Sequence, residues 1–65
     1  MTFCGTKIKN LRKLRGMTQG ELAEKVGVTQ SFISDLEYNK KFPGMPTLIK
    51  LAEVLGVTVS DLFEG

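Results

Sequence analysis

Hydrophobic residues recur at the spacing of one helical face in two short stretches near the middle of the chain. The first stretch carries Leu22, Ala23 and Val26 at i, i+1 and i+4. The second carries Ile33 and Leu36 at i and i+3. Because an α-helix turns once in about 3.6 residues, each spacing places its apolar side chains on one side of a helix. The pattern therefore predicts two consecutive amphipathic helices.

Polar residues and a glycine indicate where these two helices begin and end. Thr18 and Glu21 have the S/T-x-x-E spacing of a capping box, in which a hydroxyl and a carboxylate satisfy free amides at a helix start. Gly27 can adopt the positive φ that often follows a helix. Thr29 offers the N-cap of the next helix. The two predicted helices, joined by a tight turn, span residues 19–26 and 30–38.

A helical pattern also precedes this pair. Residues 3–15 form a predicted helix that Thr2 caps and Gly16 ends. Its inward residues are expected to be Cys4, Ile8, Leu11 and Leu14. Residues 39–44 contain Asn, Pro and Gly without a hydrophobic period, so they predict a loop after the second central helix.

Two more helices are predicted towards the end of the chain. Residues 45–55 carry an apolar stripe at helical spacing, and a glycine follows as a stop. The stripe consists of Leu48, Leu51, Ala52 and Leu55. Thr58 and Asp61 repeat the capping spacing and predict a short last helix that carries Leu62 and Phe63. The chain is thus predicted to be all-α, with five helices.

These predicted helices resemble the phage-repressor and Cro type of helix-turn-helix DNA-binding domain, also called XRE-like. In the central pair, the residues at the family's positions are Gln19, Leu22, Ala23, Val26, Gly27, Ile33, Leu36 and Glu37. The family's first helix is matched by Ile8, Leu11, Arg12 and Gly16 of this chain. Residues 47–63 resemble the family's last two helices. The resemblance implies a compact five-helix, lambda-repressor-like fold, with residues 1–65 as a single domain and double-stranded operator DNA as its partner.

The outward side of residues 30–38 is the candidate for reading DNA bases. With Ile33 and Leu36 inward, the side chains directed away from the core are Gln30, Ser31, Ser34, Asp35 and Tyr38. The first residues of a recognition helix reach deepest into the major groove, and the resemblance places base contacts at Gln30, Ser31 and Asp35. An amide such as Gln30 can pair with adenine N6 and N7, whereas a carboxylate can accept from cytosine N4.

Additional candidates on this helix face are Ser34, Phe32 and Tyr38, and several residues keep two interpretations. Asp35 either reads a base or is a solvent-facing charge, because phosphates repel a carboxylate. Phe32 either packs at the rim of the core or touches a thymine methyl group or a sugar. Tyr38 either donates its hydroxyl to a phosphate or is only solvated.

A second set of residues is expected to contact DNA phosphates. Gln19 opens the first central helix, where its two amides can meet a phosphate at the positive end of the helix dipole. The resemblance implies that a glutamine at this position makes this phosphate contact. Asn39 stands where the family usually has glycine, and asparagine tolerates the same left-handed backbone. The expected phosphate contacts are Gln19, Thr29, Asn39, Lys40 and Lys41.

Other charged residues are interpreted as structural. The resemblance pairs an arginine of the first helix with the glutamate that ends the third, so we expect a partly buried salt bridge between Arg12 and Glu37. The remaining cations of the first helix are interpreted as a solvated face: Lys7, Lys9, Lys13 and Arg15.

Charge is distributed unevenly, in a way that fits a nucleic-acid partner. Residues 1–41 carry eight Lys and Arg against four Asp and Glu, whereas residues 42–65 carry one against three. The two parts therefore have net charges of +4 and −2, which add to the +2 of the whole chain. Such asymmetry favours one surface that faces phosphates.

Composition argues against several other classes of function. One cysteine and no histidine provide neither a disulfide framework nor a zinc set, and catalysis lacks its usual groups. We therefore expect no enzyme, no metal and no cofactor. Cys4 is interpreted as a small buried hydrophobe, with a reactive thiol or an intermolecular disulfide as alternatives. Without a membrane-length apolar run or a signal peptide, a cytoplasmic location is expected.

The leading hypothesis is a sequence-specific transcriptional regulator, a repressor that binds an inverted-repeat operator as a homodimer. Val59 and Phe63, four residues apart, are expected to form the apolar face that joins the two copies. The alternative is a protein-interaction module, of antitoxin or regulator-binding type, that keeps the helix-turn-helix fold as a scaffold. The operator sequence and the direction of regulation stay open at this point.

Overall fold

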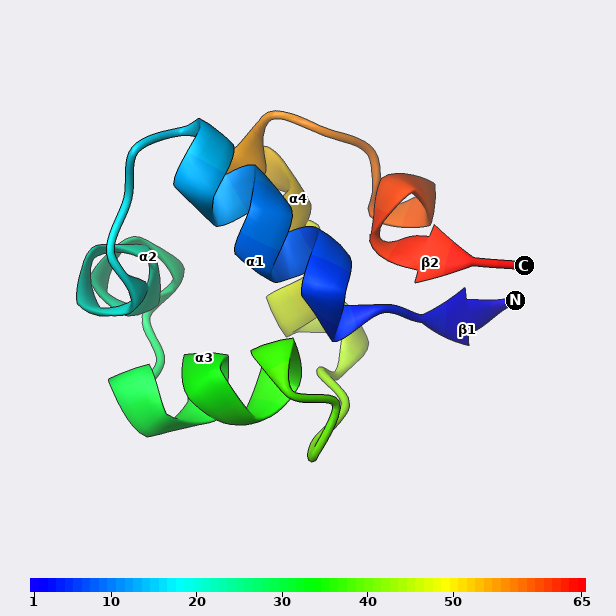
Figure 1. The fold of residues 1–65 in the computed structure, drawn as a ribbon, viewed down its shortest axis with the longest axis horizontal. Helices are drawn as coiled ribbons and strands as arrows, with labels where there is room; N and C mark the ends of the chain where they lie inside the picture. Colours follow the sequence, from blue (N-terminus) through cyan, green and yellow to red (C-terminus); the bar gives the residue numbers. More distant parts are fainter.

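The computed structural model describes all 65 residues and contains four α-helices around one hydrophobic core. The helices are α1 (Gly5–Leu14), α2 (Gln19–Val26), α3 (Gln30–Glu37) and α4 (Met45–Leu55). They are accompanied by a 3-10 turn, η1 (Val59–Leu62), and two short strands, β1 (Thr2–Phe3) and β2 (Phe63–Glu64). In Figure 1, α3 lies below α1, while the two strands and both termini lie together at the right.

The predicted limits of α2 and the predicted start of α3 are confirmed, whereas α3 ends at Glu37, one residue before the predicted end. Thr18 Oγ1 accepts from the backbone N–H of Glu21 at 3.1 Å, and Glu21 Oε1 accepts from the N–H of Thr18 at 2.9 Å. Gly27 ends α2 with φ of 86°. Thr29 Oγ1 caps α3 by accepting from the N–H of Phe32 at 3.1 Å. Both helices thus begin where their capping residues predict.

The prediction of five helices is wrong at both ends of the chain. β1 and β2 pair as an antiparallel ribbon, in which Phe3 lies opposite Phe63. The expected N-cap Thr2 is therefore in a strand, and Cys4 takes the N-cap position of α1 with extended backbone. At the other end, the ribbon holds Phe63 at φ −118°, so the last predicted helix is reduced to the single turn η1.

The core lies between the four helices and η1. Its fully buried large side chains are Ile8, Leu22, Ile33, Leu36, Leu51, Leu55 and Leu62. Two expectations for α1 are wrong. Leu14 is 75% exposed, because the buried side of α1 runs through Ile8 and Arg12 and Leu14 lies about 200° around the helix from Arg12. Cys4 is only half-buried, because it precedes the helix instead of sharing its inner face.

The start of α1 packs directly on the end of α3, which the sequence did not indicate. A Cβ on Gly5 would lie 1.8 Å from the carbonyl oxygen of Leu36, so only glycine fits between the two backbones. The N–H of Gly5 also donates to Asn39 Oδ1 at 2.9 Å. These contacts position the loop after α3 beside the first turn of α1.

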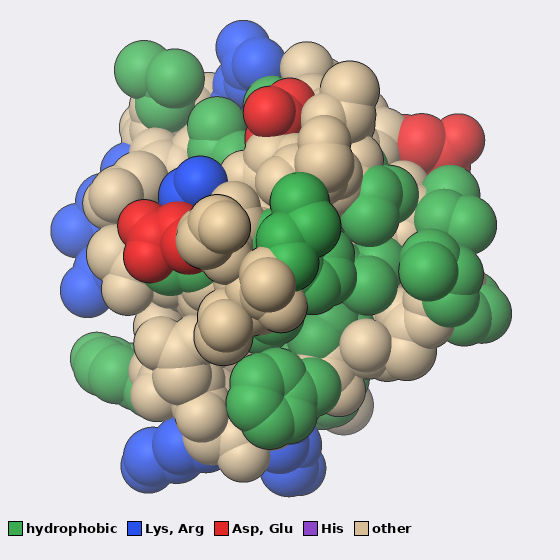
Figure 2. Space-filling model, turned by 90° about the vertical axis from the view of Figure 1, so that its right-hand side faces the viewer, with side chains coloured by type: hydrophobic (Ala, Val, Ile, Leu, Met, Phe, Trp, Pro, Cys, Tyr) green, Lys and Arg blue, Asp and Glu red, His purple; other side chains and the backbone are tan.

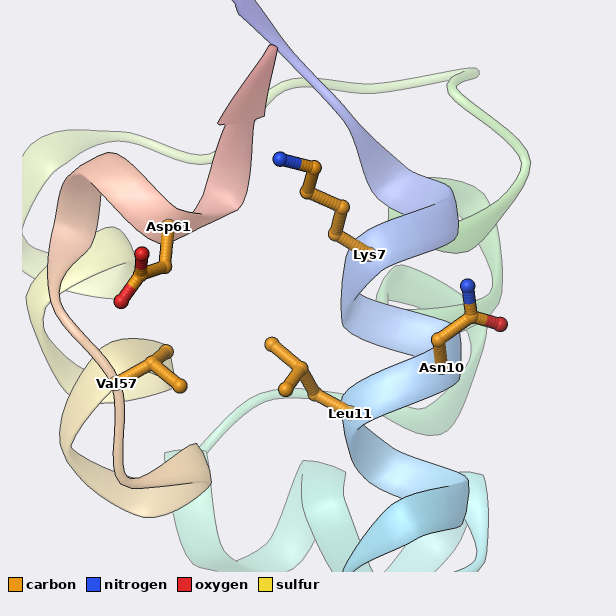
Figure 3. Close-up of a pocket in the computed structure, with 5 residues that line it drawn as sticks. All are labelled: Lys7, Asn10, Leu11, Val57 and Asp61. Atoms are coloured by element: carbon orange, nitrogen blue, oxygen red, sulfur yellow. The ribbon is translucent and has the colours of Figure 1, made fainter.

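One pocket of about 460 Å³ lies between α1 and the segment that follows α4 (Figure 3). Its lining residues are Lys7, Asn10, Leu11, Val57 and Asp61. Lys7 Nζ donates to the carbonyl oxygen of Phe63 at 2.9 Å, so this cation helps to hold β2 in place. The pocket includes no residue of α2 or α3.

Candidate nucleic-acid interface

The outward side of α3 is the side that the sequence predicts. Ile33 and Leu36 are fully buried and fix the inner face of the helix. The five outward residues are all exposed or half-buried: Gln30, Ser31, Ser34, Asp35 and Tyr38. They form one polar strip that runs from the first turn of α3 to its C-cap.

The first turn of α3 lies against the first turn of α2. A Cβ placed on Gly20 would contact Gln30 Oε1 at 3.5 Å, an ordinary van der Waals distance. The first N–H groups of a helix have no partner within that helix. The side-chain amide of Gln30 therefore lies close to a helix start that offers free donors to an anion.

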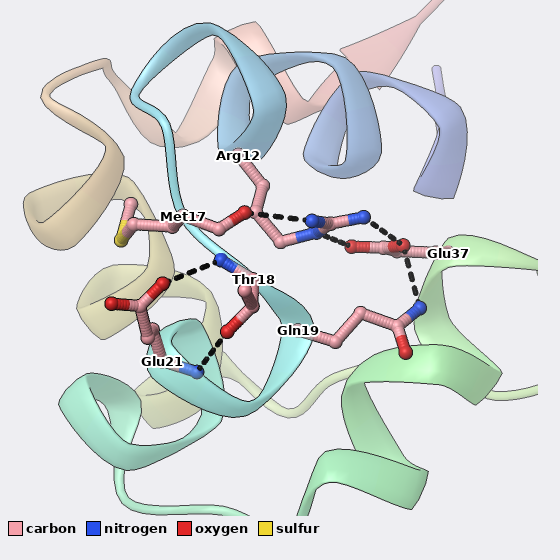
Figure 4. A network of polar contacts seen from close by, with 6 residues as sticks. All are labelled: Arg12, Met17, Thr18, Gln19, Glu21 and Glu37. Atoms are coloured by element: carbon pink, nitrogen blue, oxygen red, sulfur yellow. Dashed lines mark hydrogen bonds and ion pairs between the residues drawn. The ribbon is translucent and has the colours of Figure 1, made fainter.

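A buried ion pair connects α1 to the end of α3. Arg12 Nε lies 2.7 Å from Glu37 Oε2, and the two side chains are only 9% and 1% exposed. Arg12 Nη1 also donates to the carbonyl oxygen of Met17 at 2.8 Å, in the turn between α1 and α2 (Figure 4). The ion pair implied by the resemblance is thus present, and it ties together the three helices that carry the candidate interface.

Gln19 extends this network to the start of α2. Its Nε2 donates to Glu37 Oε1 at 3.0 Å, a contact that the sequence analysis missed (Figure 4). No local spacing could have indicated it, because the two residues lie 18 positions apart on different helices. The bond holds the side chain of Gln19 in one orientation at the N-terminus of α2. A phosphate contact by Gln19 stays a prediction.

The loop after α3 begins with the left-handed residue that the sequence predicts. Asn39 has φ of 59°. Its side chain, however, is occupied by the N–H of Gly5, so any phosphate contact by Asn39 would have to share that oxygen or use another group. Lys40 and Lys41 follow, and both are exposed.

The two loop lysines differ in their surroundings. Lys41 Nζ lies 3.4 Å from Asp35 Oδ2 and 5.9 Å from the ring centroid of Phe32. Phe32 is half-buried and packs against the core, as the rim interpretation predicts. Lys40 makes no ion pair. The structure therefore separates two residues that the sequence grouped together.

Lys9 lies beside the other end of the strip. The sequence predicts a solvated lysine here, but Lys9 Nζ lies 5.7 Å from the ring centroid of Tyr38, whose side chain is 63% exposed. Cations above an aromatic face are attracted to its negative quadrupole. Positive charge from α1 thus flanks the C-terminal end of α3.

Neither a metal centre nor a membrane span is present in the structure. No group of three or more His, Cys, Asp or Glu side chains lies close enough to hold a metal ion. None of the helices is long and apolar enough to cross a membrane.

Comparison with known proteins identifies the class of this fold and site. The family model described as Helix-turn-helix matches residues 8–62. The chain is 41% identical over 58 residues to the immunity repressor of Bacillus phage phi105, covering 89% of this chain and 40% of the repressor. It is 43% identical over 58 residues to an uncharacterized HTH-type transcriptional regulator of Archaeoglobus fulgidus, covering 89% of this chain and 83% of that regulator.

Solved structures agree with the sequence relatives. The master regulator for biofilm formation SinR, crystallised in complex with DNA, is similar with a TM-score of 0.86 and 41% identity over 92% of this chain and 97% of that one. The P22 c2 repressor, in complex with a synthetic operator, is similar with a TM-score of 0.92 and 28% identity over 100% of this chain and 98% of that one.

The chain therefore belongs to the helix-turn-helix family. Within that family it resembles the phage-repressor and Cro type, as the sequence predicts. It spans 40% of the phage phi105 repressor and 32% of the Escherichia coli regulator PuuR, to which it is 37% identical.

Proposed function

We propose that this protein is a repressor that binds an inverted-repeat operator as a homodimer and reads its sequence with α3. The observation that carries the proposal is the polar strip of α3, directed outward by two fully buried residues, Ile33 and Leu36. A helix that presents short polar side chains can enter the major groove and contact base edges. Gln30, Ser31 and Asp35 are the proposed base-reading residues.

Phosphate contacts on both sides of α3 would orient the helix in the groove. The start of α2, with Gln19 fixed by Glu37, lies on one side. The loop with Lys40 lies on the other, next to Lys9 and Tyr38. Phosphate contacts supply affinity without sequence information, and base contacts select the site. The two kinds of contact therefore come from different residues of one rigid unit.

The homodimer would form through the ribbon side of the molecule. Phe42, Phe3 and Phe63 form a chain of edge-to-face rings, with centroid distances of 6.2 and 6.0 Å. Figure 2 shows hydrophobic side chains gathered on this side, towards which both termini point in Figure 1. Val59 and Phe63, the predicted dimer residues, are half-buried, and Phe42, whose ring contacts that of Phe3, is 69% exposed. A second copy of the same face would cover this apolar surface.

Selection of random DNA duplexes by the purified protein tests the proposal. The expected result is an inverted repeat with half-site centres about 34 to 36 Å apart along the duplex, because two copies of α3 enter successive major grooves. Sedimentation of the selected duplex with protein should give two protomers per site. Affinity should fall steeply as salt rises. If no duplex is enriched, the exposed aromatic side favours the alternative of a module that binds another protein.

A further inference from the structure

We propose that Asp35 and Lys41 together form one composite site that reads a single C·G base pair in the major groove. The inference rests on the proposed function, because it requires α3 to lie in that groove. It assigns Lys41 a base contact instead of the phosphate contact that its loop position indicates. The two opposite charges act as one recognition unit.

The geometry places an acceptor and a donor side by side on the outward face of α3. Lys41 Nζ and Asp35 Oδ2 lie 3.4 Å apart. The side chain of Lys41 is 58% exposed and that of Asp35 is 30% exposed, so DNA can reach both. Lys41 reaches from the loop onto α3, because its ammonium also lies 5.9 Å from the ring centroid of Phe32, one helical turn before Asp35. The ring limits where the flexible lysine head can lie.

The spacing of these two groups fits the edge of one base pair. In the major groove, a C·G pair presents the N4 donor of cytosine beside the O6 and N7 acceptors of guanine. N4 and O6 are hydrogen-bonded to each other within the pair, so they lie about 3 Å apart. Asp35 can accept the N4 hydrogen that base pairing leaves free, while Lys41 donates to guanine O6 or N7.

Two of the other three base-pair orientations do not offer this order of groups. A T·A pair presents the O4 acceptor of thymine where the carboxylate needs a donor, and the N6 donor of adenine where the ammonium needs an acceptor. A G·C pair in the reverse orientation exchanges the two positions. An A·T pair does place the N6 donor of adenine beside the O4 acceptor of thymine, but it has the thymine methyl group where C·G has guanine N7, and its adenine N7 brings a second acceptor next to the carboxylate. The composite site therefore excludes T·A and G·C by the order of donor and acceptor, and disfavours A·T by the loss of the guanine N7 acceptor.

Pairing also removes the electrostatic objection to an acidic residue in the groove. An isolated Asp35 would bring a negative charge towards two rows of phosphates. With Lys41 at 3.4 Å, the unit that enters the groove has no net charge. Lys40 has no such partner, so its charge is free to attract phosphates.

The matched variants Lys41→Ala and Lys40→Ala test this assignment. Each removes one exposed lysine from the same loop, and circular dichroism should show unchanged folding for both. Wild type and variants are each used to select from random duplexes and are then titrated against the selected operator and its single-base-pair variants at several salt concentrations. For Lys41→Ala we expect the preference for C·G to fall about tenfold at one position of each half-site, with the other positions unchanged.

Lys40→Ala should instead weaken binding to all duplexes about equally and lower the salt slope by about one. Asp35→Asn should relax the same base pair as Lys41→Ala, and the double variant should lose little more than either single one. If Lys41→Ala behaves like Lys40→Ala, Lys41 is a phosphate contact and the composite site is wrong. If wild type selects no sequence at all, the proposed function itself is wrong. If wild type selects an operator but Lys41→Ala leaves the preference for C·G unchanged, only the composite site is wrong.

Discussion

Glu37 accepts three hydrogen bonds although its side chain is only 1% exposed. Two come from the guanidinium of Arg12 and one from the amide of Gln19. A buried carboxylate is tolerated when such partners compensate for its loss of hydration, and removal of one partner leaves an uncompensated charge. A single acidic side chain therefore joins the end of α3 to both α1 and the start of α2.

Glu37→Ala should lower the free energy of unfolding by about 3 to 5 kcal/mol, because it leaves the Arg12 guanidinium buried without its partner. A domain of this size has a net stability of roughly the same amount. The variant should thus be largely unfolded at 25 °C, as measured by urea denaturation followed by circular dichroism. Glu24→Ala, at an exposed position of α2, is the control and should change stability by less than about 0.5 kcal/mol. An unchanged denaturation midpoint for Glu37→Ala would refute this role of the pair.

Gly5→Ala should also destabilise the fold, because its Cβ would lie 1.8 Å from the Leu36 carbonyl oxygen. Backbone atoms cannot rotate away, so α1 must move off α3 at a cost of about 1 to 3 kcal/mol or more. Gly20→Ala is the matched control. The nearest atom to its Cβ would be Gln30 Oε1 at 3.5 Å, an ordinary contact distance, and alanine is the better helix former by up to about 1 kcal/mol. Thermal denaturation should move in opposite directions for the two variants; equal shifts would contradict the close approach.

Helix starts depend on ionised carboxylates in two places. The N–H and hydroxyl of Thr18 hydrogen-bond to Glu21 and lower the pKa of its carboxyl below the ordinary 4.5. Thr58 lowers the pKa of Asp61 below 3.8 in the same way at the start of η1. Because the folded pKa is depressed, each carboxylate contributes stability above its unfolded pKa. That contribution is lost as pH falls through the folded value.

Glu21→Gln should therefore reduce stability near pH 7 and make no difference at low pH, where Glu21 is protonated in both folded and unfolded protein. Urea denaturation between pH 7 and pH 2 measures the gap between wild type and variant, which should begin to close below about pH 4.5. Glu24→Gln provides the control at an exposed position outside the capping box. A gap that stays constant with pH would exclude the capping charge as its cause.

The central elements could be predicted from sequence because their signals are local. The limits of α2 follow from a capping box and a glycine, and those of α4 follow from an apolar stripe and a glycine. The outward face of α3 follows from the spacing of Ile33 and Leu36. Capping residues and helical periodicity act within a few residues, so no knowledge of tertiary structure is needed to find them.

The whole molecule contains features that local signals cannot indicate. The ribbon pairs residues about 60 positions apart through strands of only two residues, too short for an alternating pattern. The contacts of Gly5 with Leu36, of Gln19 with Glu37 and of Lys41 with Asp35 likewise join separate elements. These long-range contacts decide which candidate side chains are held in place and which stay free. They could be identified only from the structure.

Base reading by the first turn of α3 is best measured at Gln30, which is exposed there beside the start of α2. Wild type and Gln30→Ala should be titrated against the selected operator and a scrambled duplex of equal length, over a range of salt concentrations. On the operator, Gln30→Ala should lose about 1 to 3 kcal/mol and relax the choice at one base pair per half-site. On the scrambled duplex it should bind as wild type does, with the same salt slope. Equal losses on both duplexes would make Gln30 a backbone contact and contradict base reading by α3.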